Sequence, residues 1–250
     1  MAGVDRIYLC GRLVVEIGGE RVEARLPGRQ GRLLLAFLVL TRRRAVPRPK
    51  LIDAVWSEGV PGDPDGALSA LLSKLRSVLG DGAVEGRSEI QLTLPREPWV
   101  DIEAAEEALH RAESAVALGQ WRDAWAPAGV AVHVAARGFL AGYDAQWIVE
   151  KRAEVDNLFL RGLEAYAEAS LGIGGTELAT AERSARSLVK HAPLRESGHR
   201  FLMRWAEARG NLSDALRIYE DLRTLLNDEL GVGPGPETRA LHSEIVACCG

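Results

Sequence analysis

Hydrophobic and polar positions alternate in the first part of the chain and then take up helical spacing. In "RLVVEIGGERVEARL" the apolar residues Leu13, Val15 and Ile17 recur at every second position as far as Gly18 and Gly19. Alternation that ends in a Gly-Gly pair predicts two short strands joined by a tight turn. Two helices are predicted next, a buried one from about residue 30 to 40 and a short one over residues 50–56, because prolines interrupt the chain between them.

A third helix is predicted over "DPDGALSALLSKLRSVLG", residues 63–80. Asp63 or Asp65 can cap its start, Pro64 suits the first helical position, and Gly80 suits the end. The positions that recur at helical spacing and must face the core are Leu68, Leu71, Leu72, Leu75, Val78 and Leu79. The opposite face carries Ser69, Ser73, Arg76 and Ser77, with Lys74 at the margin. Short hydroxyls and long cations suit either solvent or the major groove of DNA.

A second strand pair follows in "AVEGRSEIQLTLP", with "EGRS" at its tip and Val84, Ile90, Leu92 and Leu94 facing inward. Strands, three helices and a hairpin, in that order, predict a winged helix. In such a fold the third helix reads the major groove and the hairpin, or wing, reaches the DNA backbone or minor groove.

Beyond Pro98 the pattern is helical throughout. A period of 34 residues relates Ala181, Ala185 and Leu188 to Ala215, Tyr219 and Leu222. This is the spacing of tetratricopeptide repeats, in which small residues let two helices approach closely. We therefore expect a mainly α protein, with an α+β winged helix in residues 1–97 and an all-α, tetratricopeptide-like repeat domain in residues 98–250.

Charge is distributed unevenly along the chain. The formal net charge is −4, but residues 1–97 carry +3 and the remainder −7. Eight cations and no acid lie between Glu23 and Asp53. Such a segment produces a local field that phosphate would feel, although a solvated basic surface has the same composition.

Signals for an enzyme are weak. The five histidines are scattered, and the sequence contains no HExxH motif, no CxxC pair and no GxxxxGK[ST] loop. We expect no catalytic activity, no metal and no cofactor. No apolar run approaches the roughly 20 residues of a membrane-spanning helix. The three cysteines make no disulfide framework, so a cytoplasmic protein without membrane contact is expected.

Two parts of the chain resemble one family of regulators. The run "GRQGRLLLAFLVLTRRRAVPRPKLIDAVW" together with "ALSALLSKLRSVLG" is similar to the OmpR-like DNA-binding domain of the Streptomyces antibiotic regulatory protein (SARP) family. The stretch from "HAPLRESGHRFL" to "ETRALHSEI" resembles the bacterial transcriptional activator domain that accompanies it. The resemblance implies a transcriptional regulator, usually an activator, that binds repeated half-sites in double-stranded DNA as a homodimer and recruits RNA polymerase.

The expected DNA-binding residues form two groups. Those expected to neutralise phosphates are Arg42, Arg43, Arg44, Arg48 and Arg87. Those expected in or beside the major groove are Ser69, Ser73, Lys74 and Arg76, with Arg76 able to read a guanine. The turn "SEGVPGD", residues 57–63, lies where related winged helices expose a loop to polymerase.

Other interpretations stay open at this stage. The chain could be an interaction module whose helical repeat binds a protein or ligand and whose winged helix binds DNA weakly or not at all. It could also be one segment of a longer regulator. The sequence identifies no small-molecule effector.

Overall fold

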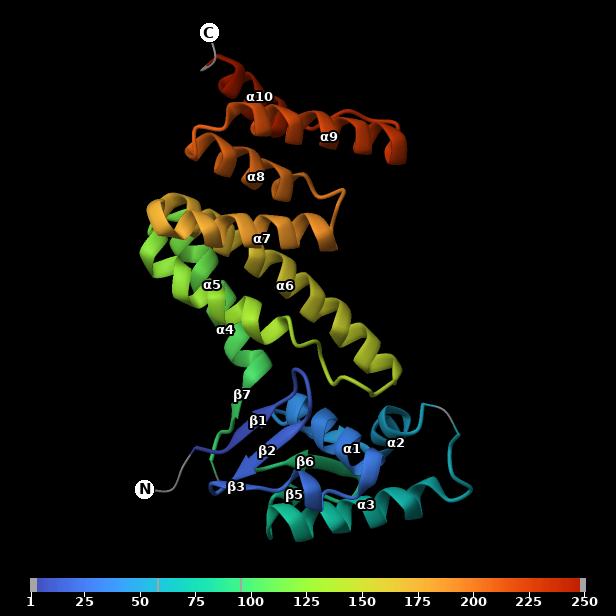
Figure 1. Ribbon diagram of the computed structural model, residues 1–250. Coiled ribbons are helices and arrows are strands. Elements are labelled where there is room, and N and C mark those ends of the chain that lie inside the picture. The colour runs from blue at the N-terminus through green and yellow to red at the C-terminus, as the bar shows by residue number, and fades with distance from the viewer. Residues whose placement is uncertain (1–3, 58, 95, 248–250) are drawn as a thin grey trace. The chain divides into compact units, whose positions relative to one another are not determined.

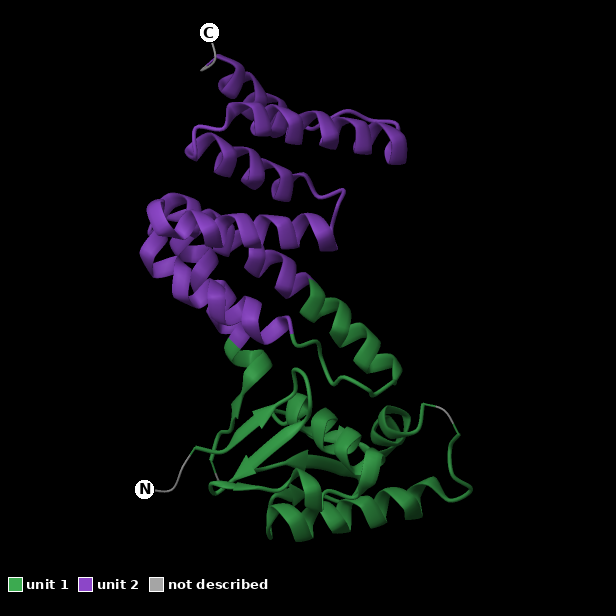
Figure 2. Cartoon of the chain, in the orientation of Figure 1, with its two compact units in different colours: residues 1–104, 137–156 green, residues 105–136, 157–250 purple. Residues whose placement is uncertain are grey.

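The computed structural model describes residues 4–57, 59–94 and 96–247, which form two compact units (Figure 2). Unit 1 comprises residues 1–104 and 137–156, and unit 2 comprises residues 105–136 and 157–250. The divisions fall inside two helices, α4 (Asp101–Ala117) and α6 (Gln146–Ile173), so each of these helices contributes residues to both units. Unit 1 therefore takes in residues from beyond position 97.

Unit 1 begins with a sheet whose strand order is β3-β2-β1-β7. Strands β1 (Arg6–Tyr8), β2 (Val14–Ile17) and β3 (Glu20–Arg21) are antiparallel neighbours, which confirms the predicted hairpin. Its turn uses Gly18 and Gly19 with φ of +62° and +88°, values that favour glycine. Strand β7 (Trp99–Val100) pairs parallel with β1 and was not predicted.

The three predicted helices and the wing follow in unit 1. In chain order the elements are η1 (Glu23–Arg25), α1 (Gly28–Thr41), β4 (Val46–Pro47), α2 (Arg48–Val55), α3 (Pro64–Leu79), β5 (Val84–Glu85) and β6 (Glu89–Leu92). Helix α1 is buried continuously from Leu33 to Val39 because α2, α3 and β6 all contact it. A second small sheet, β4-β6-β5, forms the wing. The winged-helix prediction is confirmed.

The segment after α5 (Trp121–Ala135) completes the core of unit 1. Leu140 donates its backbone N–H to Leu9 O at 2.8 Å, and Gly11 donates to Gly138 O at 2.6 Å. The fully buried carboxylate of Asp101 accepts the backbone N–H groups of Leu9 at 2.8 Å and Cys10 at 3.1 Å. Residues distant in sequence thereby satisfy the backbone where β1 ends.

Unit 2 is helical. Besides its parts of α4 and α6, it contains α5 (Trp121–Ala135), η2 (Gly175–Glu177), α7 (Leu178–His191), α8 (Glu196–Ala208), α9 (Leu212–Leu230) and α10 (Pro236–Ala247). Helices α7 to α10 contact one another in chain order, as Figure 1 shows. All six residues of the 34-residue period are buried. The repeat prediction, and with it the expected fold class, is confirmed.

Candidate DNA-binding surface

Helix α3 is defined by local signals at both ends. The Asp63 carboxylate accepts the backbone N–H of Gly66 at 2.9 Å, so Asp63 is the N-cap and Pro64 is the first helical residue. The helix ends at Gly80, whose φ is +97°. Four leucines at helical spacing, Leu68, Leu72, Leu75 and Leu79, are buried, while Leu71 and Val78 are half-buried. These constraints fix which side of the helix faces solvent.

The solvent-facing side of α3 carries small polar groups and one cation. Ser69, Ser73, Lys74 and Ser77 are all exposed. The Ser69 hydroxyl donates to Asp65 O at 2.8 Å and therefore lies flat against the helix. A face without bulky or acidic side chains at these positions can approach the edges of bases closely.

Arg48 joins three elements of this surface. Its Nε donates to Asp65 Oδ1 at 2.9 Å and its Nη2 to Ser69 Oγ at 2.9 Å, which connects α2 to the first turns of α3. Its backbone N–H donates to Ser88 O at 3.2 Å, which connects α2 to the tip of the wing. Asp65 offsets the charge of Arg48, and the same ion pair reduces the repulsion that Asp65 would exert on a phosphate.

Arg76 connects α3 to the wing. Its Nε donates to Val84 O at 2.9 Å and its Nη2 to Gly86 O at 3.4 Å. These two nitrogens form one of the two edges through which a guanidinium can make a bidentate contact with guanine. In this structure that edge of Arg76 faces the wing and connects α3 to it.

The wing tip requires glycine. At Gly86 the φ is +93°, and a Cβ there would lie 1.8 Å from Glu89 O. The resulting tight turn exposes Arg87 between Glu85 and Glu89. Val84, Ile90 and Leu92 are buried as predicted, whereas Leu94 is half-buried. Pro95, at the end of the predicted hairpin, lies outside the described residues.

Arg42 does not belong to the surface. Its side chain is only 7% exposed, and its guanidinium binds Glu103 Oε1 at 2.5 Å and Glu97 Oε1 at 2.6 Å. The hydrogen bonds to Glu103 and then Glu97 raise the pKa of Arg42 above its usual range against the opposing effect of burial. The expectation that Arg42 contacts phosphate does not fit this geometry, because both donor edges of its guanidinium are bound to carboxylates inside unit 1.

The remaining predicted cations are available to solvent. Arg43 and Arg44, in the loop after α1, are exposed, as are Lys74 and Arg87. Within the described part of the chain none of these four has a carboxylate within ion-pair distance. Lys50, at the start of α2, shares both properties and was not among the predicted site residues. The only feature of the sequence that could have indicated Lys50 is its position in the basic segment between Glu23 and Asp53.

The loop that links the predicted residues is connected to the wing. Gln91 donates its side-chain amide to Arg42 O at 3.0 Å, and Val46 pairs with Ile90 in the β4–β6 ladder. The structure thus places α3, the wing and the loop bearing Arg43 and Arg44 in one hydrogen-bonded framework.

Residues 4–57, 59–94 and 96–247 contain neither a candidate metal site nor a candidate membrane-spanning helix. In those ranges no group of three or more His, Cys, Asp and Glu side chains is placed to hold a metal ion. Nor does any helix there have the length and apolar character needed to cross a membrane.

The fold and this surface define a winged-helix protein with a helical-repeat partner domain. Residues 100–246 match the family model of the bacterial transcriptional activator domain. Since the match covers more than half of the chain, the chain belongs to this family, that of the SARP-type transcriptional regulators.

Similar proteins share both parts of the chain. Regulatory protein AfsR of Streptomyces coelicolor is 31% identical over 254 residues, an alignment that covers 98% of this chain and 24% of AfsR. Transcriptional regulator RedD of the same organism is 28% identical, with 86% of this chain and 63% of RedD covered. A solved structure of Mycobacterium tuberculosis EmbR in complex with a low-affinity phosphopeptide has a TM-score of 0.85 and 25% identity, covering 98% of this chain and 65% of that one. The chain thus spans about a quarter of AfsR and less than two thirds of RedD and EmbR.

Proposed function

We propose that the protein is a sequence-specific DNA-binding transcriptional regulator whose winged helix, residues 1–97, places α3 in the major groove. One observation carries the proposal. The small, polar outer face of α3 is hydrogen-bonded through Arg48 and Arg76 to elements that present exposed cations without carboxylate partners. Cations of this kind bind phosphates and fix the register, while the helix face reads base edges.

The nine predicted residues then have four different roles. Arg43, Arg44 and Arg87 contact phosphates, and Ser69, Ser73 and Lys74 lie in or beside the groove. Arg48 and Arg76 hold α2, α3 and the wing in register. Arg42 stabilises unit 1 and contacts no DNA.

Assembly on DNA is a further part of the proposal. The family membership supports activation by recruitment of RNA polymerase, with the repeat domain of residues 98–250 contributing to a homodimer on repeated half-sites. The loop at residues 57–63 is our proposed polymerase contact. Its Val60 is 57% exposed, and Glu58 in the same loop lies outside the described residues. An exposed apolar side chain of this kind suits a protein contact.

The primary test is selection from a randomised duplex library at near-physiological salt, followed by sequencing of the bound fraction. The expected result is a repeated motif with half-sites about one helical turn apart. Lys74→Ala should relax the base preference at one position, whereas Arg43→Ala should weaken binding to all sequences alike.

A matched control is Arg111→Ala, which removes an exposed cation of α4 in unit 2. It should leave affinity and base preference unchanged. If a well-folded chain enriched no motif, or if Arg111→Ala and Arg43→Ala weakened binding equally, the proposed surface would be wrong. An activation test follows with in vitro transcription: Val60→Ser should lower transcript yield while DNA affinity is retained.

A further inference from the structure

A cleft of about 430 Å³ lies in unit 1, outside the proposed DNA-binding surface. The cleft is formed by the β1–β2 turn, β3, η1, α1 and the segment after α5. The charged and aromatic residues that line it are Arg12, Arg21, Glu23, Arg32 and Tyr143, and Leu13 lines it as well. The volume lies within the range of small-molecule binding sites.

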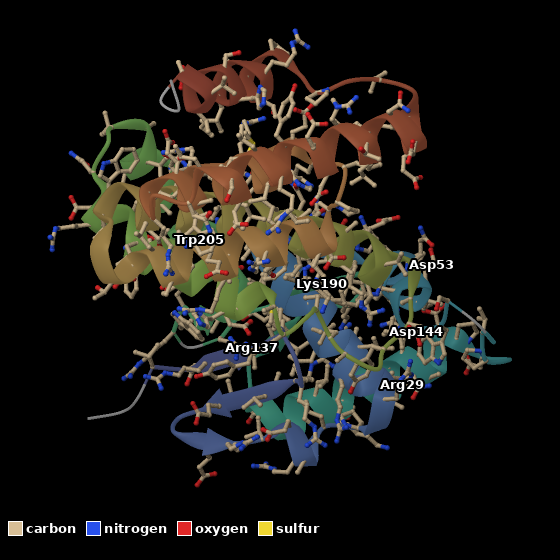
Figure 3. All side chains as sticks on the ribbon, turned by 45° about the horizontal axis from the view of Figure 1, so that its top comes forward. Arg29, Asp53, Arg137, Asp144, Lys190 and Trp205 are labelled. Carbon is tan, nitrogen blue, oxygen red and sulfur yellow. The ribbon has the colours of Figure 1, made fainter. Side chains whose placement is uncertain are left out.

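The wall that contains Tyr143 is held in place by hydrogen bonds. Besides the backbone contacts of residues 138–140 with Leu9 and Gly11, Arg29 donates to Gly142 O at 2.6 Å. The guanidinium of Arg29 also lies over the Tyr143 ring, 4.9 Å from its centre. Figure 3 shows Arg29 beside Asp144, with which it forms a 3.9 Å ion pair. The cleft is therefore formed before any ligand arrives.

The cleft has a surplus of positive charge. Arg21 is paired with Glu23, its Nε lying 2.8 Å from Glu23 Oε1. Arg12 and Arg32 have no such partner among the described residues. The Nε of Arg32 is also buried and donates no hydrogen bond to any described group. A buried donor without an acceptor is costly, and a ligand oxygen would satisfy it.

We propose that this cleft binds a small organic anion that carries a phosphate group. The phosphate would lie between Arg12 and Arg32, because guanidinium groups match phosphate oxygens in charge and geometry. The apolar body would lie against Leu13, Ala24 and the ring of Tyr143, which line the same cleft. This site goes beyond the proposed DNA binding and does not depend on it.

A small ligand fits better here than the backbone of DNA. Within unit 1, α3 lies along one edge, and residues 137–145 lie at the opposite edge (Figure 1). The wall of the cleft formed by residues 137–145 therefore lies away from a duplex bound to α3. A cleft of this volume also accommodates one small molecule and not a helix about 20 Å wide.

The experiment is a titration of the whole 250-residue chain with phenyl phosphate, followed by ¹⁵N-resolved NMR. Benzyl alcohol, which has the same aromatic ring but no charge, is the control ligand for phenyl phosphate. The expected result is saturable binding of phenyl phosphate, with shifts at Arg12, Arg32 and Tyr143, and no binding of benzyl alcohol. Arg32→Gln and Arg12→Gln should each weaken binding at least tenfold. Arg25→Gln removes an exposed cation of η1 that does not line the cleft, and should change affinity less than twofold.

Other outcomes would overturn the proposal. One is that binding of phenyl phosphate does not saturate. The other is that Arg25→Gln loses as much affinity for phenyl phosphate as Arg12→Gln and Arg32→Gln do, which would indicate general attraction to a basic surface. Arg12 is exposed, so its variant stays informative even if Arg32→Gln fails to fold. Affinity for nonspecific DNA is measured separately on the Arg12→Gln variant. A loss as large as that of Arg43→Ala would assign the cleft to the DNA backbone instead. The ligand titration contains no DNA, so its failure leaves the proposed function untouched.

Discussion

Replacing Arg42 and Arg43 by methionine, one at a time, should separate structural from DNA-binding arginines. The two residues are neighbours, but Arg42 is 7% exposed and bound to Glu97 and Glu103, whereas Arg43 is exposed and has no carboxylate partner in the described part of the chain. Arg42 also donates to Val39 O at 3.0 Å, so its side chain closes the end of α1. Methionine keeps much of the side-chain length and removes the charge.

The loss of unfolding free energy expected for Arg42→Met follows from the exposure of its two carboxylate partners, Glu97 and Glu103. Removing one member of a fully buried ion pair costs about 3–5 kcal/mol, while an exposed pair contributes about 0.2–1 kcal/mol. Glu103 is 34% exposed and Glu97 71%, so water partly solvates both carboxylates after the substitution. We expect an intermediate loss of about 2–3 kcal/mol of unfolding free energy. For Arg43→Met the change should stay within about 0.5 kcal/mol.

Urea denaturation and amide hydrogen exchange of α1 measure the stability of unit 1, and DNA titration at two salt concentrations measures binding. Arg42→Met should lose protection in α1 while the folded protein keeps its DNA affinity. Arg43→Met should keep its protection, bind DNA more weakly and show a shallower salt dependence. Unchanged exchange in α1 of Arg42→Met would contradict its structural role. A loss of DNA affinity and salt dependence in Arg42→Met as large as that in Arg43→Met would contradict the separation of the two roles.

Three further substitutions test other parts of the structure. Gly86→Ala should distort the wing and reduce DNA affinity, because its Cβ would meet Glu89 O at 1.8 Å; unchanged affinity would contradict this. Burial lowers the pKa of His199, so the unfolded chain takes up a proton more readily than the folded one as pH falls below about 6.5. Unit 2 should therefore lose stability between pH 7 and 5. The thermal unfolding temperature of His199→Gln should fall less over this range than that of the unaltered protein. Identical pH profiles of the two proteins would exclude the effect. Ala215→Leu, at a fully buried repeat position, should destabilise unit 2 by about 1–3 kcal/mol in urea unfolding, whereas Ser213→Ala, at an exposed position of α9, should not.

Local patterns in the sequence predicted α3 and the repeat correctly. The cap at Asp63, the end at Gly80 and the four buried leucines all lie within one helix, where spacing alone determines which residues share a face. The 34-residue period that relates Ala181 to Ala215 also predicts burial correctly, because equivalent positions of successive repeats make equivalent contacts.

Contacts between distant segments could not be predicted from spacing. Asp101 is the first residue of α4, and its Oδ1 accepts the backbone N–H of Ile102 at 2.9 Å. The same carboxylate also accepts the N–H groups of Leu9 and Cys10, more than 90 positions earlier in the chain. Neither this contact nor the β1–β7 pairing leaves a periodic signal, because only a few residues on each side take part.

The basic segment shows why charge density alone gives a poor map of a phosphate-binding surface. Between Glu23 and Asp53 the sequence presents eight cations as equivalent, but the fold gives them different environments. Arg42 is neutralised by two glutamates, Arg48 by Asp65, and Arg29 lies over an aromatic ring. Arg32 lines the cleft that also contains Arg12 and Tyr143. Each neutralised phosphate adds about −0.9 to the slope of log affinity against log salt. The slope for DNA binding should therefore follow the exposed cations without carboxylate partners around α3, and not the total in the sequence. Acids far away in the chain, such as Glu97 and Glu103, decide which arginines remain available.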